Sequence, residues 1–152
     1  MKLSEFVLQS RGAGGFDSYL HPQTIPTPLG EFSLEFQVKN AARRPPDEKM
    51  LAAIITLRQA LESDLHALVT LVHEQYLLAA EDEEWCEVCE LPTGLGADEL
   101  APLLEGQTIS VAQQETDADE PHPGRVYISP QWDQEHGLYV ARIDDRWVLV
   151  DC

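Results

Sequence analysis

Apolar and polar side chains alternate along residues 32–39, and this is the clearest pattern in the chain. Phe32, Leu34, Phe36 and Val38 are separated by Ser33, Glu35, Gln37 and Lys39. Successive side chains of a β-strand point to opposite faces, so a period of two places the four apolar residues on one face. The pattern predicts a half-buried strand whose apolar face belongs to the core.

A second apolar pattern, with steps of three or four residues, runs from about residue 47 to residue 80. Its members are Met50, Ile54, Leu57, Leu61, Leu65, Leu68, Val72 and Tyr76. This spacing is typical of one face of an α-helix, and Asp47 has the short polar side chain that caps helix N-termini. We therefore predict one long helix, about 50 Å in length. The sequence also allows a kink near residues 62–64, because Ser63 or Asp64 could cap a second segment.

Shorter patterns surround these two elements. Two early strands are expected at residues 1–9 and 16–20, and the proline-rich residues 21–30 indicate a turn. After the long helix we expect a short helix at 98–104 and strands at 108–111, 125–128, 137–143 and 147–150. Asp144-Asp145 lies between the last two strands and predicts a tight hairpin turn.

The order of elements indicates the fold class. Strands come first, one helix follows, and further strands close the chain, which is typical of an α+β domain. We predict an antiparallel sheet packed on one long helix, with a C-terminal β-hairpin, as a single domain over residues 1–152. A chain of 152 residues that is 43% hydrophobic is long and apolar enough for one core, and wholesale disorder is excluded.

Charge is distributed very unevenly along this chain. The formal net charge is −17, yet residues 59–124 contain 16 acidic residues and no Lys or Arg. One run consists of Glu81, Asp82, Glu83 and Glu84, and Trp85 follows it directly; a second cluster consists of Glu115, Asp117, Asp119 and Glu120. Acidic runs of this kind are typical either of a solvated, solubilising face or of a surface that meets a basic partner.

The same charge excludes two classes of partner. Nucleic-acid binding requires cations that replace counterions on the phosphates, and an anionic membrane would repel the chain. The N-terminus has an early acid and no apolar segment of the kind found in secretory signals. We expect a cytoplasmic protein with no cofactor and no membrane contact, and the oligomeric state stays open.

The string from Trp132 to Leu138, W-D-Q-E-H-G-L, is the most distinctive local sequence. In a structural interpretation, Trp132 closes one end of the core, Asp133 accepts backbone N–H bonds in a turn, His136 bonds locally and Gly137 supplies a positive φ. In the alternative, Asp133, Glu135 and His136 form a metal-binding module or a small metal-dependent enzyme. We favour the structural interpretation and expect no enzyme.

Cys86 and Cys89 form a C-x-x-C pair without the second pair that a structural zinc site needs. Neighbouring acids, among them Glu84, Glu87 and Glu90, should raise the pKa of both thiols and make them less reactive. The pair is expected to be two reduced cysteines at a helix end or in a loop, although metal binding stays open.

The W-D-x-E-H-G-L string followed by a terminal hairpin resembles an uncharacterised bacterial domain family of similar length. The resemblance implies early strands, a helix that ends near a tyrosine, a short helix and closing strands, with Tyr76 and Trp85 where such members carry aromatics. The chain departs from this pattern by Asp144-Asp145, where Asp-Gly is common, and by its C-x-x-C pair. Small acidic bacterial proteins of this kind often act as immunity partners of toxins, which is an analogy only.

Three functions follow as hypotheses. The first is an acidic bacterial inhibitor, such as an immunity protein, that neutralises a basic toxin by electrostatic steering and occlusion. Its partner-binding residues are predicted to be Glu81, Asp82, Glu83, Glu84 and Trp85, with the tryptophan as an aromatic anchor in a charged rim. The second is the metal-binding module around Asp133, Glu135 and His136. The third is a DNA mimic whose carboxylates imitate phosphates.

Overall fold

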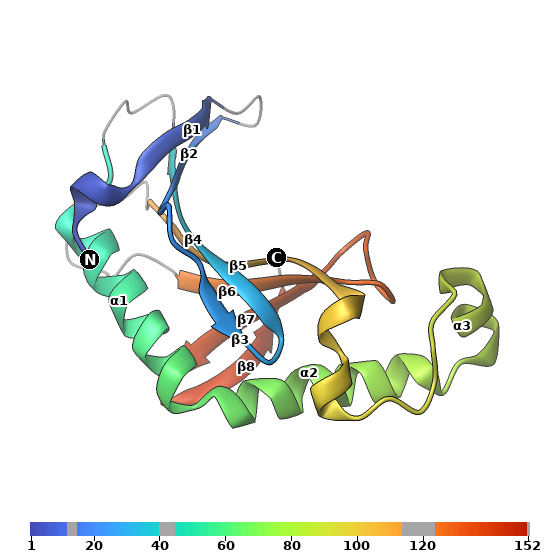
Figure 1. The fold of residues 1–152 in the computed structure, drawn as a ribbon. Helices are drawn as coiled ribbons and strands as arrows, with labels where there is room; N and C mark the ends of the chain where they lie inside the picture. Colours follow the sequence, from blue (N-terminus) through green and yellow to red (C-terminus); the bar gives the residue numbers. More distant parts are fainter. Residues whose placement is uncertain (12–14, 40–44, 114–123, 152) are drawn as a thin grey trace.

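The computed structural model describes residues 1–11, 15–39, 45–113 and 124–151, and these form one eight-stranded sheet with helices on one side (Figure 1). The strand order is β1-β2-β4-β5-β6-β7-β8, and β3 pairs separately with β4. The strands are β1 (Val7–Arg11), β2 (Phe16–Leu20), β3 (Ile25–Thr27), β4 (Gly30–Lys39), β5 (Leu104–Ala112), β6 (Gly124–Pro130), β7 (Leu138–Ile143) and β8 (Arg146–Val150).

Three α-helices connect β4 to β5 in the described part of the chain. They are α1 (Glu48–Ser63), α2 (Leu65–Ala80) and α3 (Glu83–Cys89). Single 3-10 turns lie at Leu3–Glu5, Ala97–Glu99 and Ala101–Leu103. The last two replace the predicted short helix at 98–104, whereas α3 was not predicted. None of the helices in the described ranges is long and apolar enough to cross a bilayer.

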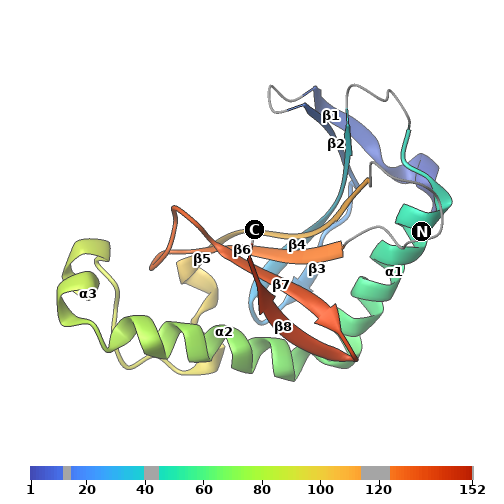
Figure 2. The same ribbon diagram turned by 180° about the vertical axis from the view of Figure 1, so that it is seen from behind.

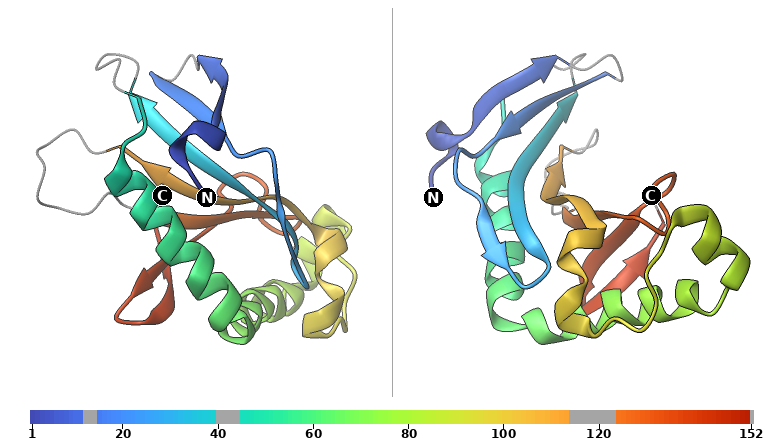
Figure 3. Two further views of the ribbon diagram at one scale, coloured as in Figure 1. Left: turned by 60° about the vertical axis from the view of Figure 1, so that its left-hand side comes forward. Right: turned by 45° about the vertical axis from the view of Figure 1, so that its right-hand side comes forward.

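The core lies between α1 and the sheet, as the two apolar patterns predict. Phe32, Leu34, Phe36 and Val38 are all buried on one face of β4. Helix α1 crosses that side of the sheet against β5 and β6, which is visible in the left view of Figure 3. The helix caps as predicted, because Asp47 accepts a hydrogen bond from the Met50 N–H at 2.9 Å.

The prediction of one long helix is wrong and the alternative of a break near residues 62–64 is confirmed, because α1 ends at Ser63 and the chain breaks at Asp64. This residue has φ −131° and ψ 37°, and α1 and α2 leave it in different directions (Figure 2). The Asp64 backbone oxygen accepts a hydrogen bond from the Trp147 indole at 2.9 Å, and its carboxylate pairs with Arg142 at 2.7 Å. The hairpin β7–β8 therefore contacts the chain at the break through one hydrogen bond to backbone and one ion pair.

The prediction of an antiparallel sheet is also wrong at one position. Strands β4 and β5 pair in parallel, with Leu34 opposite Ile109 and Phe36 opposite Val111, while the other pairings are antiparallel. A parallel pair needs a long crossover connection, and α1 to α3 provide it. The fold is therefore α+β with a mixed sheet.

The C-terminal hairpin is confirmed. Arg142 pairs with Trp147 and Ile143 with Arg146, so the loop contains only Asp144 and Asp145. Both have positive φ, at 50° and 58°, which is the backbone that a two-residue type I′ turn requires. The second acidic cluster, Glu115 to Glu120, lies outside the described residues.

Candidate functional site

The W-D-x-E-H-G-L string forms the connection between β6 and β7. Asp133 organises it, since its carboxylate accepts bonds from the His136 N–H at 3.2 Å and from the His136 ring at 3.1 Å. Its backbone oxygen accepts from the Gly137 N–H, and Gly137 has φ 77°, as predicted. Trp132 is buried and meets the Tyr76 ring edge-on, with the ring centroids 5.7 Å apart. We call residues 131–137 the motif loop.

Helix α3 carries the acidic run. Asp82 caps the helix by accepting a hydrogen bond from the Trp85 N–H at 3.0 Å. Glu83 and Glu84 occupy the first turn, where negatively charged side chains interact favourably with the helix dipole. Glu90 ends the helix in the left-handed region with φ 54°. Local sequence therefore explains why a helix of only seven residues forms here.

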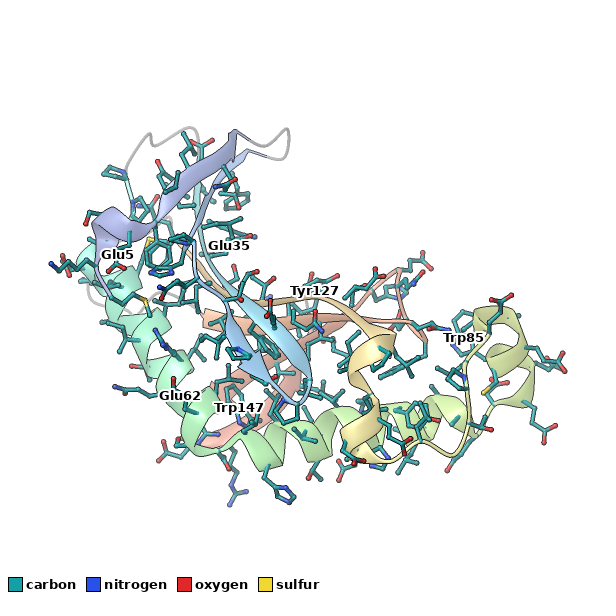
Figure 4. The ribbon with its side chains drawn as sticks, in the orientation of Figure 1. Glu5, Glu35, Glu62, Trp85, Tyr127 and Trp147 are labelled. Carbon is teal, nitrogen blue, oxygen red and sulfur yellow. The ribbon has the colours of Figure 1, made fainter. Side chains whose placement is uncertain are left out.

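Two side chains join α3 to the motif loop. The Trp85 indole donates to the Trp132 backbone oxygen at 2.7 Å, across 47 residues of sequence. From the other side, the Gln131 amide donates to the Cys89 and Glu90 backbone oxygens at 2.8 and 3.0 Å. Figure 4 shows Trp85 between α3 and the motif loop. The acidic run and the W-D-x-E-H-G-L string, which are far apart in sequence, are therefore neighbours in space.

A groove of about 780 Å³ lies between the end of α2, α3 and the motif loop, and we call it the α3 groove. Its lining includes Leu78, Trp85 and Val88, whose exposed fractions are 61%, 43% and 72%. Large apolar side chains this exposed, gathered in one concave place, are typical of surfaces that bind a partner.

The polar part of the α3 groove is acidic. Asp82, Glu90, Asp133 and Glu135 line it, with His136, and no Lys or Arg does so within the described residues. Carboxylates beside exposed apolar groups attract a ligand that combines positive charge with an apolar anchor.

The structure thus separates the residues predicted for partner binding. Asp82 and Trp85 line the α3 groove, whereas Glu81, Glu83 and Glu84 are exposed but do not line it. The sequence reasoning missed Leu78, Val88 and Gln131. A signal for Leu78 was present, because it lies off the buried stripe of α2 and so had no predicted place in the core.

The metal alternative gains no support from this geometry. Asp133 and His136 bond to each other, while Glu135 is exposed. In the ranges that the structure describes, no group of three or more His, Cys, Asp or Glu side chains could hold a metal ion. The alternative stays a prediction.

Cys86 and Cys89 are free thiols, one turn apart on α3. The Cys86 thiol donates to the Ala79 and Ala80 backbone oxygens at 3.6 and 3.7 Å. Burial, and then the nearby Cys86 and Asp82, raise the pKa of Cys89. The predicted rise in pKa is confirmed for Cys89, but its causes do not include Glu84, Glu87 and Glu90. A raised pKa lowers the thiolate fraction at neutral pH, so Cys89 is poorly suited to be a nucleophile.

Comparisons with protein family models, with curated proteins and with solved structures found no match. The resemblance to a bacterial domain family therefore stays a prediction.

Proposed function

We propose that this chain is a binding protein whose α3 groove receives a basic segment of a partner protein. In this role it inhibits the partner, as an immunity protein inhibits a toxin, by covering a basic functional surface. The observation that carries the proposal is the combination, in one groove, of exposed Leu78, Trp85 and Val88 with an acidic rim that contains no base within the described residues.

Two steps of recognition follow from the charge. The acidic stretch 59–124 includes α2 and α3, so a basic partner approaches this end of the molecule preferentially. After the encounter, the apolar side chains supply binding energy, because aromatic anchors surrounded by a polar rim dominate most protein interfaces. Charge therefore sets the association rate and specificity, while Trp85 and its neighbours set the lifetime of the complex.

Trp85 is suited to be the anchor because its orientation is fixed before binding. The indole N–H donates to the Trp132 backbone oxygen, and α3 is held to the motif loop by Gln131 as well. A side chain that is already ordered loses less conformational entropy when a partner covers it. This gives the motif loop a supporting role in binding in addition to its role in the fold.

Site-specific photocrosslinking tests this proposal in cells of the source organism, which express the protein from its own gene. Benzoylphenylalanine replaces Val88 in the α3 groove and, as a control, Ile143 beside the β7–β8 turn; both side chains are exposed, at 72% and 47%. We expect Val88→benzoylphenylalanine to capture a protein with an excess of Lys and Arg, and the control to capture none of it. An acidic partner, the same partner from both positions, or no capture contradicts the proposal.

A further inference from the structure

In the described part of the chain, no helix covers the second face of the sheet. Glu35 and Tyr127 lie on this face, away from α2 (Figure 4). A groove of about 800 Å³ lies there, at some distance along the sheet from α3, and we call it the sheet groove. It shares none of its lining residues with the α3 groove.

The sheet groove follows β5 because that strand has only small side chains on this face. Thr108, Ser110 and Ala112 form the floor, over about 13 Å of strand. The neighbouring strands carry larger groups, with Glu35 on β4 and Arg125 on β6 both in register with Ser110. Neighbouring strands are about 4.8 Å apart, so these two walls are separated by about 10 Å.

One wall of the sheet groove is aromatic. The Tyr127 and Tyr139 rings are 5.0 Å apart and tilted by 49°. Gly137 makes room for Tyr127, since a Cβ there would be 2.5 Å from Cε2 of the ring, whereas a Cβ at Gly106 would be at an ordinary contact distance of 3.6 Å from Cε1. The backbone at Gly137 on one side and the Tyr139 ring on another therefore limit the position of the Tyr127 ring, as a pre-ordered platform requires.

The polar groups of the sheet groove are also positioned in advance. Oε1 of Glu35 accepts hydrogen bonds from the Gln37 amide at 2.8 Å and from the Ser110 hydroxyl at 3.4 Å. The Arg125 guanidinium lies 5.9 Å from the centre of the Tyr139 ring. An acceptor held by two hydrogen bonds and a guanidinium close to an aromatic ring thus lie on opposite sides of a floor of small side chains.

The described lining of the sheet groove carries no net formal charge, which suits a neutral ligand. Glu35 and Arg125 are the only charged residues that line it in the described ranges, and their formal charges cancel. An uncharged ligand is repelled neither by Glu35 nor by Arg125, whereas the net charge of −17 disfavours anions. Hydroxyl groups both donate and accept hydrogen bonds, so one neutral polyol can satisfy the carboxylate and the guanidinium together.

We propose that the sheet groove binds a neutral oligosaccharide chain. The C–H face of a sugar ring carries partial positive charge and packs on the negative faces of Tyr127 and Tyr139. The ring hydroxyls donate to Glu35 and accept from Arg125, in charge-assisted hydrogen bonds stronger than those between neutral groups. The length of the floor along β5 accommodates a chain rather than a single ring.

Saturation-transfer NMR with the full chain tests this proposal. The probes, each at about 5 mM, are the hexamers of β-1,4-linked glucose, α-1,4-linked glucose and N-acetylglucosamine, with hexagalacturonate as the anionic control. We expect transfer to at least one neutral hexamer and a weaker signal from the anionic one. Absence of transfer to all three neutral hexamers, or stronger binding of hexagalacturonate, overturns the proposal.

Two variants locate the binding. Tyr127→Ala removes the platform, and Glu35→Gln keeps the shape of the side chain but removes the charged acceptor; each should weaken binding about 10-fold. Val88→Ser in the α3 groove is the matched control and should bind as the wild type does. If Glu35→Gln leaves the affinity unchanged, the sheet groove is not the sugar site, whatever Tyr127→Ala does to folding.

Discussion

Trp132→Ala is expected to lower the free energy of unfolding by about 4 kcal/mol, because it removes a large buried side chain and leaves a cavity. The Trp132 ring is only 5% exposed and packs on Tyr76, whose hydroxyl bonds to the Pro92 backbone oxygen at 2.6 Å. The substitution therefore opens the core where α2, the motif loop and the segment after α3 meet. Equilibrium unfolding in urea measures the change.

The matched control is Trp85→Ala, which removes the same side chain from a half-exposed position. Its ring is 43% exposed and makes one hydrogen bond to backbone, so a loss of about 1 kcal/mol is expected. A large loss of unfolding free energy in Trp132→Ala and a small one in Trp85→Ala would show that Trp132 stabilises the core, whereas Trp85 is mainly a surface residue. Equal losses would contradict the burial on which this distinction rests.

Gly137→Ala is expected to cost about 3 kcal/mol, from two causes that act together. The residue has φ 77°, where a Cβ is strained. The added Cβ would also be 2.5 Å from Cε2 and 3.0 Å from the hydroxyl of Tyr127, so the ring or the motif loop must shift. Thermal or urea unfolding measures the loss.

Gly94→Ala isolates the backbone cause. Gly94 has φ 78°, nearly the same as Gly137, but a Cβ there would meet no atom within 4 Å. We expect a loss of about 1 kcal/mol, the cost of the left-handed conformation alone. The difference between the two glycines is then the cost of displacing Tyr127, and a difference near zero would refute that contact.

Local pattern was sufficient for the elements whose partners are close in sequence. The alternation from Phe32 to Val38 predicted the buried face of β4, and Asp144-Asp145 predicted a two-residue turn. In both cases the controlling interactions are the strand's own periodicity or the turn's own backbone.

The local sequence pattern was insufficient where residues that are distant in sequence determine the structure. The apolar stripe of residues 50–76 continues past Asp64, so periodicity alone indicates one helix, and only the possible caps Ser63 and Asp64 pointed to a break near residues 62–64. The break is held by Arg142 and Trp147, which are 78 and 83 residues away. The parallel β4–β5 pair was missed for a related reason, because strand direction depends on where the crossover of three helices returns the chain.

The sequence predicted two parts of the candidate site separately. The sequence pointed to the acidic run with Trp85 and to the W-D-x-E-H-G-L string, which occupy different parts of the chain, and did not predict that they are neighbours. They join through hydrogen bonds from Trp85 and Gln131 that span 47 and 42 residues, which no local pattern encodes. The apolar side of the α3 groove becomes clear only from the structure, where α2 extends beyond the sheet and Leu78 and Val88 are exposed (Figure 1).

Calorimetric titration shows whether the α3 groove binds a basic partner through an apolar anchor. The partner is the protein captured through position 88, titrated against the wild type, Trp85→Ala and the control Val148→Ala, a 37% exposed residue of β8. We expect Trp85→Ala to raise the Kd by about 30-fold or more, and Val148→Ala to leave it unchanged. An unchanged Kd for Trp85→Ala would contradict the account.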